Sequence, residues 1–188
     1  MIAAGEGRGP WMQTFTGRAW HFLTPRADDV DVRDVAHALG MLCRYGGHSR
    51  HFYSVAEHSV LVSRLVRPEH ALQGLLHDAT EAYIVDVPRP LKHVLEGYKP
   101  MEAAHWRVIA ERFGVPEELS DDVKRVDNAM LFVEKPQVLG PCSPWMEREW
   151  GMGAEPDPSM SRVELEFLSP EEAEKSFLRR FHELTAQR

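Results

Sequence analysis

Residues 74–92 read GLLHDATEAYIVDVPRPLK. This stretch combines an apolar helical pattern with three acids, an imidazole and an ammonium. The apolar residues in and before it recur at helical spacing, so we expect a buried helix over about 68–85. Pro88 and Pro90 cannot continue such a helix and end it. Because charged groups on a buried helix are costly unless they are paired or bind a ligand, this stretch also indicates where a site would lie.

Helical patterns continue on both sides of this stretch. Ser54 and Ser169 are each followed three residues later by a glutamate, the capping-box pattern that opens a helix. Gly114 is expected to cap the end of another helix. Together with the helix at 68–85, the predicted helices cover 31–45, 54–66, about 101–113, about 121–134 and the C-terminal 169–186.

The remaining segments are predicted to be non-helical. Residues 12–25, MQTFTGRAWHFLTP, indicate a short hairpin or extended arm turning at Gly17. Residues 136–168 are rich in Pro, Gly, Ser and Trp and predict an irregular segment, with a short strand at 162–168. The small, Gly-rich residues 1–10 are expected to be flexible. The fold class is therefore all-α: one domain over 1–188, with about six helices, an N-terminal hairpin and an irregular segment before the last helix.

The composition narrows the classes of partner. The chain has 188 residues and a net charge of −7, which makes nucleic acid an unfavourable partner. No apolar run reaches the length of a membrane helix, and the N-terminus lacks the apolar core of a secretory signal. Two cysteines fit a reducing cytoplasm, where we expect the protein to act. Trp145 and Trp150 are expected to pack within the chain or between the subunits of a homo-oligomer.

Two histidines and two aspartates form the candidate metal site. His77 and Asp78 lie on the helix of residues 68–85, with Glu81 on the same side, while His58 and Asp127 lie on two other predicted helices. Taken alone, His58 is more often a satisfied core histidine, and Asp127 a buried ion-pair partner. Taken together they supply two imidazoles and two carboxylates, a set that suits a divalent ion with coordination positions left open for catalysis.

Three motifs carry a resemblance to a known family. VAEHSVLV at 55–62, LLHDATEAYIVDVPRPLK at 75–92 and VDNAML at 126–131 resemble the successive motifs of HD-domain phosphohydrolases. The similarity is greatest to bacterial 5′-deoxynucleotidases and to short HD enzymes that act on nucleoside triphosphates, such as phage dATP triphosphohydrolases and the oxetanocin triphosphate hydrolase. The resemblance spans about residues 31–135 and implies an HD-domain helical bundle.

The resemblance also implies a role for each site residue. Those implied to bind the metal are His58, His77, Asp78 and Asp127. Glu81 matches an acid that orients or protonates the attacking water or the leaving group, and Asp86 a catalytic residue near the sugar. Those implied to bind substrate are Lys92 and Arg44 on phosphate and Tyr45 on the base, the last two from CRYGGHSRHFYSVAEH at 43–58. Tyr45 stands where Trp is common.

The expected function is metal-dependent hydrolysis of the 5′-phosphate groups of (deoxy)nucleotides, a small-molecule substrate, through a metal-activated water. The ion would be Mn, Co, Fe, Ni, Mg or Zn, and in the triphosphate-acting relatives a second metal can be held at the positions of Glu81 and Asp86. Two alternatives stay open. One is HD hydrolysis of another phosphate substrate, such as an alarmone or a cyclic nucleotide. The other is a non-catalytic HD module that binds a nucleotide or a metal.

Overall fold

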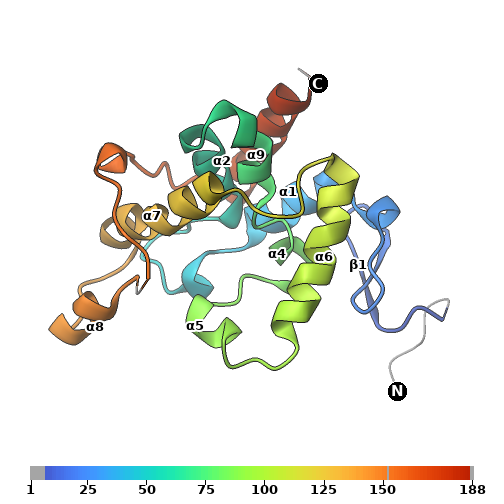
Figure 1. Cartoon of the computed structure of the whole chain (residues 1–188), viewed down its shortest axis with the longest axis horizontal. Helices are drawn as coiled ribbons and strands as arrows, with labels where there is room; N and C mark the ends of the chain where they lie inside the picture. The colour runs from blue at the N-terminus through green and yellow to red at the C-terminus, as the bar shows by residue number, and fades with distance from the viewer. Residues whose placement is uncertain (1–6, 152, 187–188) are drawn as a thin grey trace.

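The computed structural model describes residues 7–151 and 153–186, and in that part of the chain helices dominate (Figure 1). The strands β1 (Trp11–Gln13) and β2 (Ala19–His21) form an antiparallel hairpin that turns at Gly17, as predicted. The predicted all-α fold with a short N-terminal hairpin is confirmed. The helices, in chain order, are α1 (Val32–Met41), α2 (Val55–Leu65), α3 (Ala71–Leu76), α4 (Glu81–Ile84), α5 (Arg89–Lys92), α6 (Tyr98–Phe113), α7 (Asp121–Val138), α8 (Pro144–Glu149) and α9 (Pro170–Thr185).

Short 3-10 turns connect several of these helices. Their bounds are Ala27–Asp29, Tyr45–Gly47, Pro68–His70 and Pro158–Met160. None of the described helices is both long and apolar enough to cross a membrane. Part of the predicted flexible segment 1–10 lies outside the described residues. In the described part of this segment, Arg8 forms an ion pair with Asp29 at 2.7 Å.

The helix α2 is buried on nearly all sides and separates two apolar cores. One core packs α1, α3, α6 and α9 around side chains such as Leu39, Leu75 and Phe177. The other packs α2 against α7 through side chains such as Val62 and Met130. A helix buried all round must satisfy its polar groups inside the protein, and α2 carries Glu57 and His58 there, at 3% and 0% exposure.

The predicted continuous helix over 68–85 is wrong, because the chain turns between α3 and α4. The backbone N–H of Ala79 donates to the carbonyl of Leu76 and that of Glu81 to the carbonyl of Asp78, both in the tighter i to i+3 pattern. The Nδ1 of His77 forms a hydrogen bond with the carbonyl of Gly74 at 2.8 Å. In an unbroken helix this carbonyl would accept from a backbone N–H instead. The turn projects His77 and Asp78 toward α2.

Several predicted boundaries also differ. The helix predicted over 31–45 ends at Met41, because residues after it extend and Cys43 bridges to Ser54. The helix predicted over 101–113 begins earlier, at Tyr98, although Gly114 caps its end as predicted with φ 65°. The helix predicted over 121–134 continues to Val138.

The segment 136–168 contains α8 and no strand in its described residues, so the strand predicted at 162–168 is wrong. The backbone N–H groups of Glu166, Phe167 and Leu168 donate to the Glu57 carboxylate at 2.8, 3.1 and 2.9 Å, and these bonds replace strand pairing. We call this set the loop anchor. It also corrects the capping box predicted at Ser54, since Ser54 accepts from the N–H of Glu57 but the Glu57 carboxylate is used elsewhere. The capping box at Ser169 is confirmed in full.

Candidate metal centre

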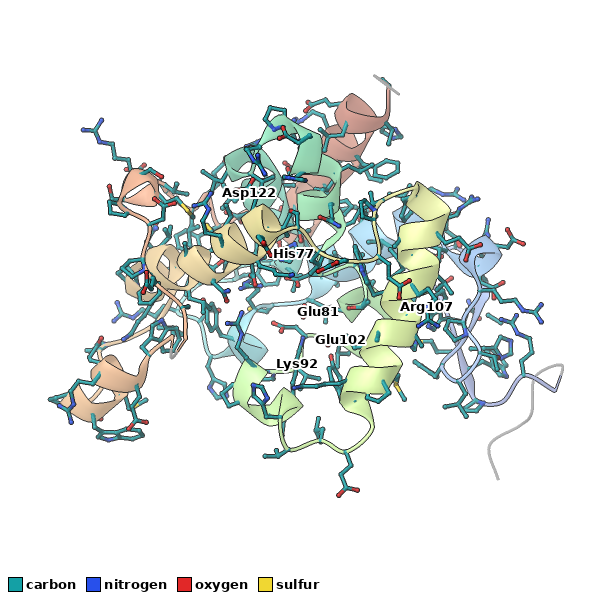
Figure 2. All side chains as sticks on the ribbon, in the orientation of Figure 1. His77, Glu81, Lys92, Glu102, Arg107 and Asp122 are labelled. Carbon is teal, nitrogen blue, oxygen red and sulfur yellow. The ribbon has the colours of Figure 1, made fainter. Side chains whose placement is uncertain are left out.

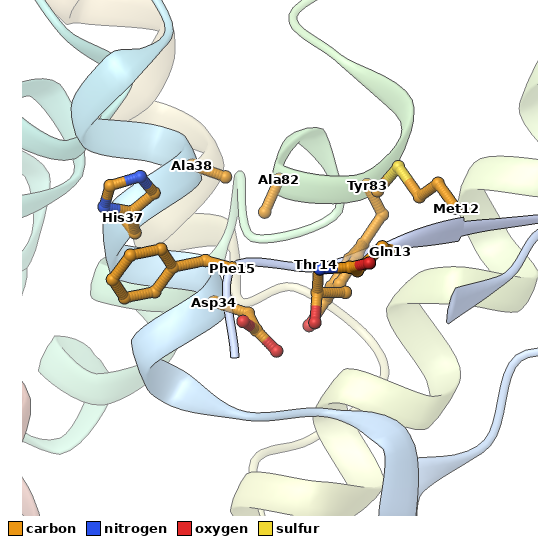
Figure 3. Close-up of a pocket in the computed structure, with 9 residues that line it drawn as sticks. All are labelled: Met12, Gln13, Thr14, Phe15, Asp34, His37, Ala38, Ala82 and Tyr83. Carbon is orange, nitrogen blue, oxygen red and sulfur yellow. The ribbon is translucent and has the colours of Figure 1, made fainter. Parts of the chain in front are cut away.

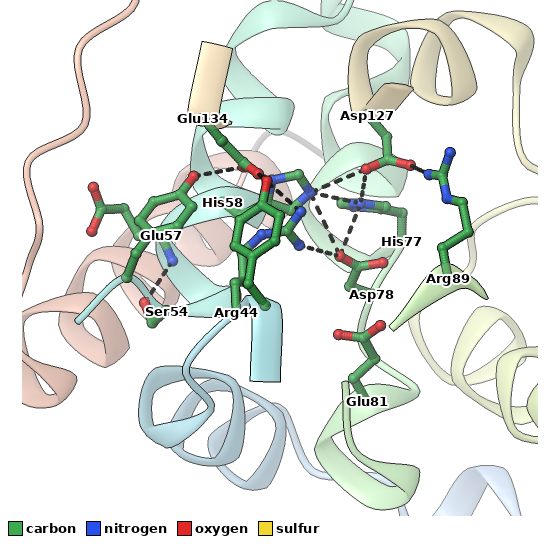
Figure 4. A network of polar contacts seen from close by, with 12 residues as sticks. Arg44, Ser54, Glu57, His58, His77, Asp78, Glu81, Arg89, Asp127 and Glu134 are labelled. Carbon is green, nitrogen blue, oxygen red and sulfur yellow. Dashed lines mark hydrogen bonds and ion pairs between the residues drawn. The ribbon is translucent and has the colours of Figure 1, made fainter. Parts of the chain in front are cut away.

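Three elements bring the predicted metal ligands together. His58 comes from α2, His77 and Asp78 from the turn after α3, and Asp127 from α7 (Figure 4). Gly74 lets α3 approach α2 closely, since a Cβ there would lie 3.2 Å from a methyl of Val66. We call the four side chains His58, His77, Asp78 and Asp127 the His–Asp cluster.

The ligand atoms of this cluster face one another. The Nε2 atoms of His58 and His77 are 3.3 Å apart, and Asp127 Oδ1 lies 3.3 Å from the first and 3.7 Å from the second. These three residues form a group whose ligand atoms all lie within 4.8 Å of one another, which could hold a metal ion. Asp78 Oδ2 lies 3.2 Å from His77 Nε2 and 3.6 Å from His58 Nε2, so it borders this group as a fourth oxygen.

The hydrogen bonds behind the two imidazoles test whether the group fits a cation. The Nδ1 of His58 contacts Glu134 Oε1 at 2.6 Å, and the Nδ1 of His77 contacts the Gly74 carbonyl at 2.8 Å. Both partners accept, so each Nδ1 carries a proton and the Nε2 atom of each ring points into the cluster, where it can bind an ion once it is deprotonated. Two Nε2 atoms and carboxylate oxygens that face one another require positive charge between them, either as protons on the imidazoles or as a bound cation. The residues present therefore fit a divalent ion.

Without an ion, the pKa shifts favour protons on the imidazoles at the place where a cation would lie. Burial acts to lower the pKa of His77, but Asp78 and Asp127 more than offset it and raise this pKa well above its usual value. Burial likewise acts to raise the pKa of Asp127, and hydrogen bonds from His58 and His77 hold it well below its usual range. The cluster thus favours positive charge at its centre.

A second polar group lies beside this cluster and joins Glu81 of α4, Lys92 of α5 and Glu102 of α6 (Figure 2). Lys92 Nζ contacts Glu81 Oε1 at 3.3 Å and Glu102 Oε1 at 2.8 Å, so its charge is shared. Burial, followed by the carboxylates of Asp78 and Asp86, raises the pKa of Glu81 well above its usual value. The second carboxylate oxygen of Glu81 is buried without a hydrogen-bond partner. A carboxyl in this setting is suited to hold a proton and release it.

Asp86 follows a strained residue at the end of α4. Val85 has φ 62°, a left-handed conformation that is costly for a β-branched side chain. Burial raises the pKa of the half-buried Asp86, with Arg44 opposing and Asp78 adding to the shift. The charges that act on Asp86 are thus those of the cluster region, and its predicted role near the sugar stays a prediction.

The predicted substrate residues Arg44 and Tyr45 lie behind the cluster. Arg44 is 8% exposed and forms ion pairs with Glu134 at 3.1 Å and with Asp78 at 3.5 Å. The hydroxyl of Tyr45 donates to Glu134 at 2.5 Å, and its ring stacks on Trp150 with centroids 6.2 Å apart. Contact of Arg44 with phosphate and of Tyr45 with a base stays a prediction.

The sequence analysis missed three charged residues of this region. Glu134 accepts hydrogen bonds from four side chains around the cluster, and Glu102 shares Lys92. Arg89 is half-exposed and contacts Asp127 Oδ2 at 3.3 Å. A signal existed for Glu134, which stands in an apolar run seven residues after Asp127 and hence on the same helix face.

A cavity of about 320 Å³ lies between the hairpin, α1 and α4 (Figure 3). Its lining contains none of the predicted site residues. Both carboxylate oxygens of Asp34 accept hydrogen bonds from Thr16, and His37 contacts Glu174 at 2.9 Å and stacks on Phe15. These polar groups are already paired within the protein, so the cavity does not compete with the cluster as a site.

The fold and the cluster define a helical protein in which two buried histidines and a partly buried aspartate converge. Two related proteins share most of its length. The chain is 39% identical over 179 residues to the uncharacterized protein YfdR of Escherichia coli (strain K12), covering 95% of this chain and 97% of that protein. It is 30% identical over 189 residues to the uncharacterized protein RCAP_rcc00048 of Rhodobacter capsulatus, covering 93% and 95%. The chain belongs to the family of these two proteins. No family model matches it.

Proposed function

We propose that this protein is an HD-type, metal-dependent phosphohydrolase that removes phosphate from the 5′ side of (deoxy)nucleotides. The observation that carries the proposal is the pair of imidazole Nε2 atoms 3.3 Å apart, with Asp127 Oδ1 beside both and acceptors behind each ring. A divalent ion held there would polarise a phosphoryl oxygen and activate water.

Cations next to the cluster support a phosphate substrate. Lys92 and Arg89 come from the VPRPLK segment at 87–92, which follows α4 and contains α5. Arg89 lies against Asp127, and Lys92 against Glu81. In this proposal their charged groups turn from these carboxylates to the phosphate oxygens and stabilise the charge that develops there.

Glu81 is the proposed proton carrier. Its raised pKa keeps it protonated nearer to neutral pH than an exposed glutamate, and its free Oε2 can donate that proton to a leaving oxygen. Before substrate binds, Lys92 contacts Oε1 and so orients the carboxyl group. The Asp86 carboxylate contributes to the raised pKa of Glu81. In this proposal Asp86 contacts the sugar.

Phosphate release from a nucleotide panel tests the function. Purified protein is stripped with chelator, reloaded separately with Mn²⁺, Co²⁺ or Mg²⁺, and given mono-, di- and triphosphates of ribo- and deoxynucleosides, with products identified by chromatography. We expect chelator to abolish release and a metal to restore it. Activity confined to alarmones or cyclic nucleotides would shift the proposal to another HD substrate. Nucleotide binding without any turnover would instead favour a non-catalytic module.

A further inference from the structure

Glu134 is the most enclosed acid of the region, at 0% exposure within an apolar stretch of α7. Its Oε1 accepts from His58 Nδ1 at 2.6 Å and from the Tyr53 hydroxyl at 2.9 Å. Its Oε2 accepts from the Tyr45 hydroxyl at 2.5 Å and from Arg44 at 3.1 Å. Each carboxylate oxygen thus receives two donors, which fills the acceptor capacity of an ionised carboxylate.

We propose that Glu134 is a positioning residue that fixes His58 in its Nδ1–H form, so that His58 Nε2 can bind a divalent ion. The proposal rests on the metal centre of the proposed function. The ionised, accepting state follows from the surroundings: the Arg44 guanidinium and the hydroxyls of Tyr45 and Tyr53 all donate to this carboxylate. An ionised carboxylate can only accept, so the proton of this contact belongs to His58.

Geometry makes the role specific. Asp127 and Glu134 are seven residues apart on α7, so one helix face presents a carboxylate to the front of His58 and another to its back. The Tyr53, Tyr45 and Arg44 donors prevent the Glu134 carboxylate from rotating away. Because Arg44 also reaches Asp78 at 3.5 Å, Glu134 holds a second side chain at the cluster as well.

A purely structural role is the competing explanation, and Glu57 supplies the matched control. Glu57 is also buried and multiply hydrogen-bonded and precedes His58 in the chain, but its carboxylate serves the loop anchor and points away from the cluster (Figure 4). If burial of an acid near α2 were all that mattered, Glu57→Gln and Glu134→Gln would have similar effects.

The substitution Glu134→Gln keeps the shape and replaces one oxygen by an NH₂ donor. If the NH₂ faces Arg44, it and the guanidinium are both donors and cannot form a hydrogen bond with each other. If it faces His58, the imidazole must accept through Nδ1 and carry its proton on Nε2, which blocks metal binding. We therefore expect a 10- to 100-fold weaker affinity for the ion, the usual range for loss of a partner behind a ligating histidine.

The experiment measures metal binding and the state of His58, without an activity assay. Mn²⁺ titrations followed by electron paramagnetic resonance compare wild type, Glu134→Gln and Glu57→Gln, and ¹H–¹⁵N spectra of the Zn²⁺-loaded proteins identify the protonated imidazole nitrogen. We expect weaker binding with an altered His58 signal in Glu134→Gln alone. Unchanged Mn²⁺ affinity in Glu134→Gln, or equal losses in both variants, would overturn the proposal.

The wild-type spectrum decides the matter even if Glu134→Gln fails to fold. We expect His58 to carry its proton on Nδ1 and His58 Nε2 to bind Zn²⁺, and the reverse arrangement would refute the role of Glu134. Wild-type protein that bound no ion would overturn the metal centre itself. The role of Glu134 would then be judged by the metal-free spectra, in which loss of the Nδ1–H signal from Glu134→Gln supports positioning and its retention refutes it.

Discussion

Two buried polar regions begin at neighbouring residues of α2 and differ in how their charges are satisfied. In the loop anchor, three backbone N–H groups converge on the Glu57 carboxylate, so donors and acceptor match. In the His–Asp cluster, imidazole Nε2 atoms and carboxylate oxygens face one another at 3.2 to 3.7 Å. Burial of charge alone therefore does not mark a functional site. Imidazoles and carboxylates from separate helices that converge on one point do, because they form a ligand set that suits a cation.

The strongest way to break this contrast is to remove a carboxylate from the cluster. Asp127→Ala should reduce metal content to background and lower phosphate release by more than ~10⁴-fold, above the usual loss for a general acid, because the ion is lost as well. Elemental analysis and a turnover assay measure both. Asp122→Ala is the control, since Asp122 lies on the same helix but bonds to Arg67 and Arg125. Equal metal content in Asp127→Ala and wild type would remove Asp127 from the centre.

The next largest effect concerns the proton carrier beside the cluster. Glu81→Gln keeps the size of the side chain but cannot release a proton, so turnover should fall by ~10²–10⁴-fold while the metal stays bound. The pairing of turnover with metal content separates this variant from Asp127→Ala. Near-normal turnover would exclude Glu81 from the proposed mechanism.

Lys92 sharpens the question of substrate. A triphosphate carries more charge than a monophosphate, so loss of one charge-assisted hydrogen bond, about 1.5–3 kcal/mol, should weigh more on it. Lys92→Ala should lower kcat/KM for dATP by roughly 10- to 100-fold and for dAMP by less. Lys175→Ala, which removes an exposed lysine paired with Glu171, is the control. Equal losses for both substrates, or wild-type activity on dAMP alone, would favour the 5′-deoxynucleotidase alternative.

The two regions also show what local sequence could predict. Helix caps at Ser169 and Gly114 and the hairpin at Gly17 depend on a few neighbouring residues, and all three were predicted. The break between α3 and α4 was not, since the apolar pattern there is helical and the turn depends on the His77 bond to Gly74 and on packing against α2.

Long-range partners explain the residues that were missed. His58 lies 76 positions before Glu134, and Arg44 lies 90 before it. The loop anchor likewise joins Glu57 to residues about 110 positions away, so a sequence pattern typical of a capping box gave no hint of its true partners. The metal-ligand candidates could be named because their chemistry is specific, whereas the carboxylates that support them resemble ordinary helix acids.

The loop anchor itself should respond in stability and not in metal binding. In Glu57→Gln the new NH₂ group faces either Leu168 N–H or the N–H pair of Glu166 and Phe167, so at least one buried bond is lost. We expect the free energy of unfolding to fall by about 1–3 kcal/mol in urea titrations. Glu166→Gln, an exposed change in the same loop, should stay within about 0.5 kcal/mol. Unaltered stability in Glu57→Gln would mean that the anchor contributes little.

A partly buried carboxylate at a helix end completes the comparison with the smallest effect. Asp31 caps α1, and its hydrogen bonds from Arg33 lower its pKa to about 2 against an opposing effect of burial. A folded-state pKa below the unfolded value adds stability above about pH 4, and that stability is lost as the pH falls from about 4 to 2. Because its partner Arg33 is exposed and water screens the pair, the loss should stay below about 1 kcal/mol. Asp31→Asn keeps a capping side chain but not the charge. Urea unfolding at pH 5 and pH 3 should therefore show a smaller pH dependence in Asp31→Asn than in wild type, and an identical dependence would show that water screens this pair completely.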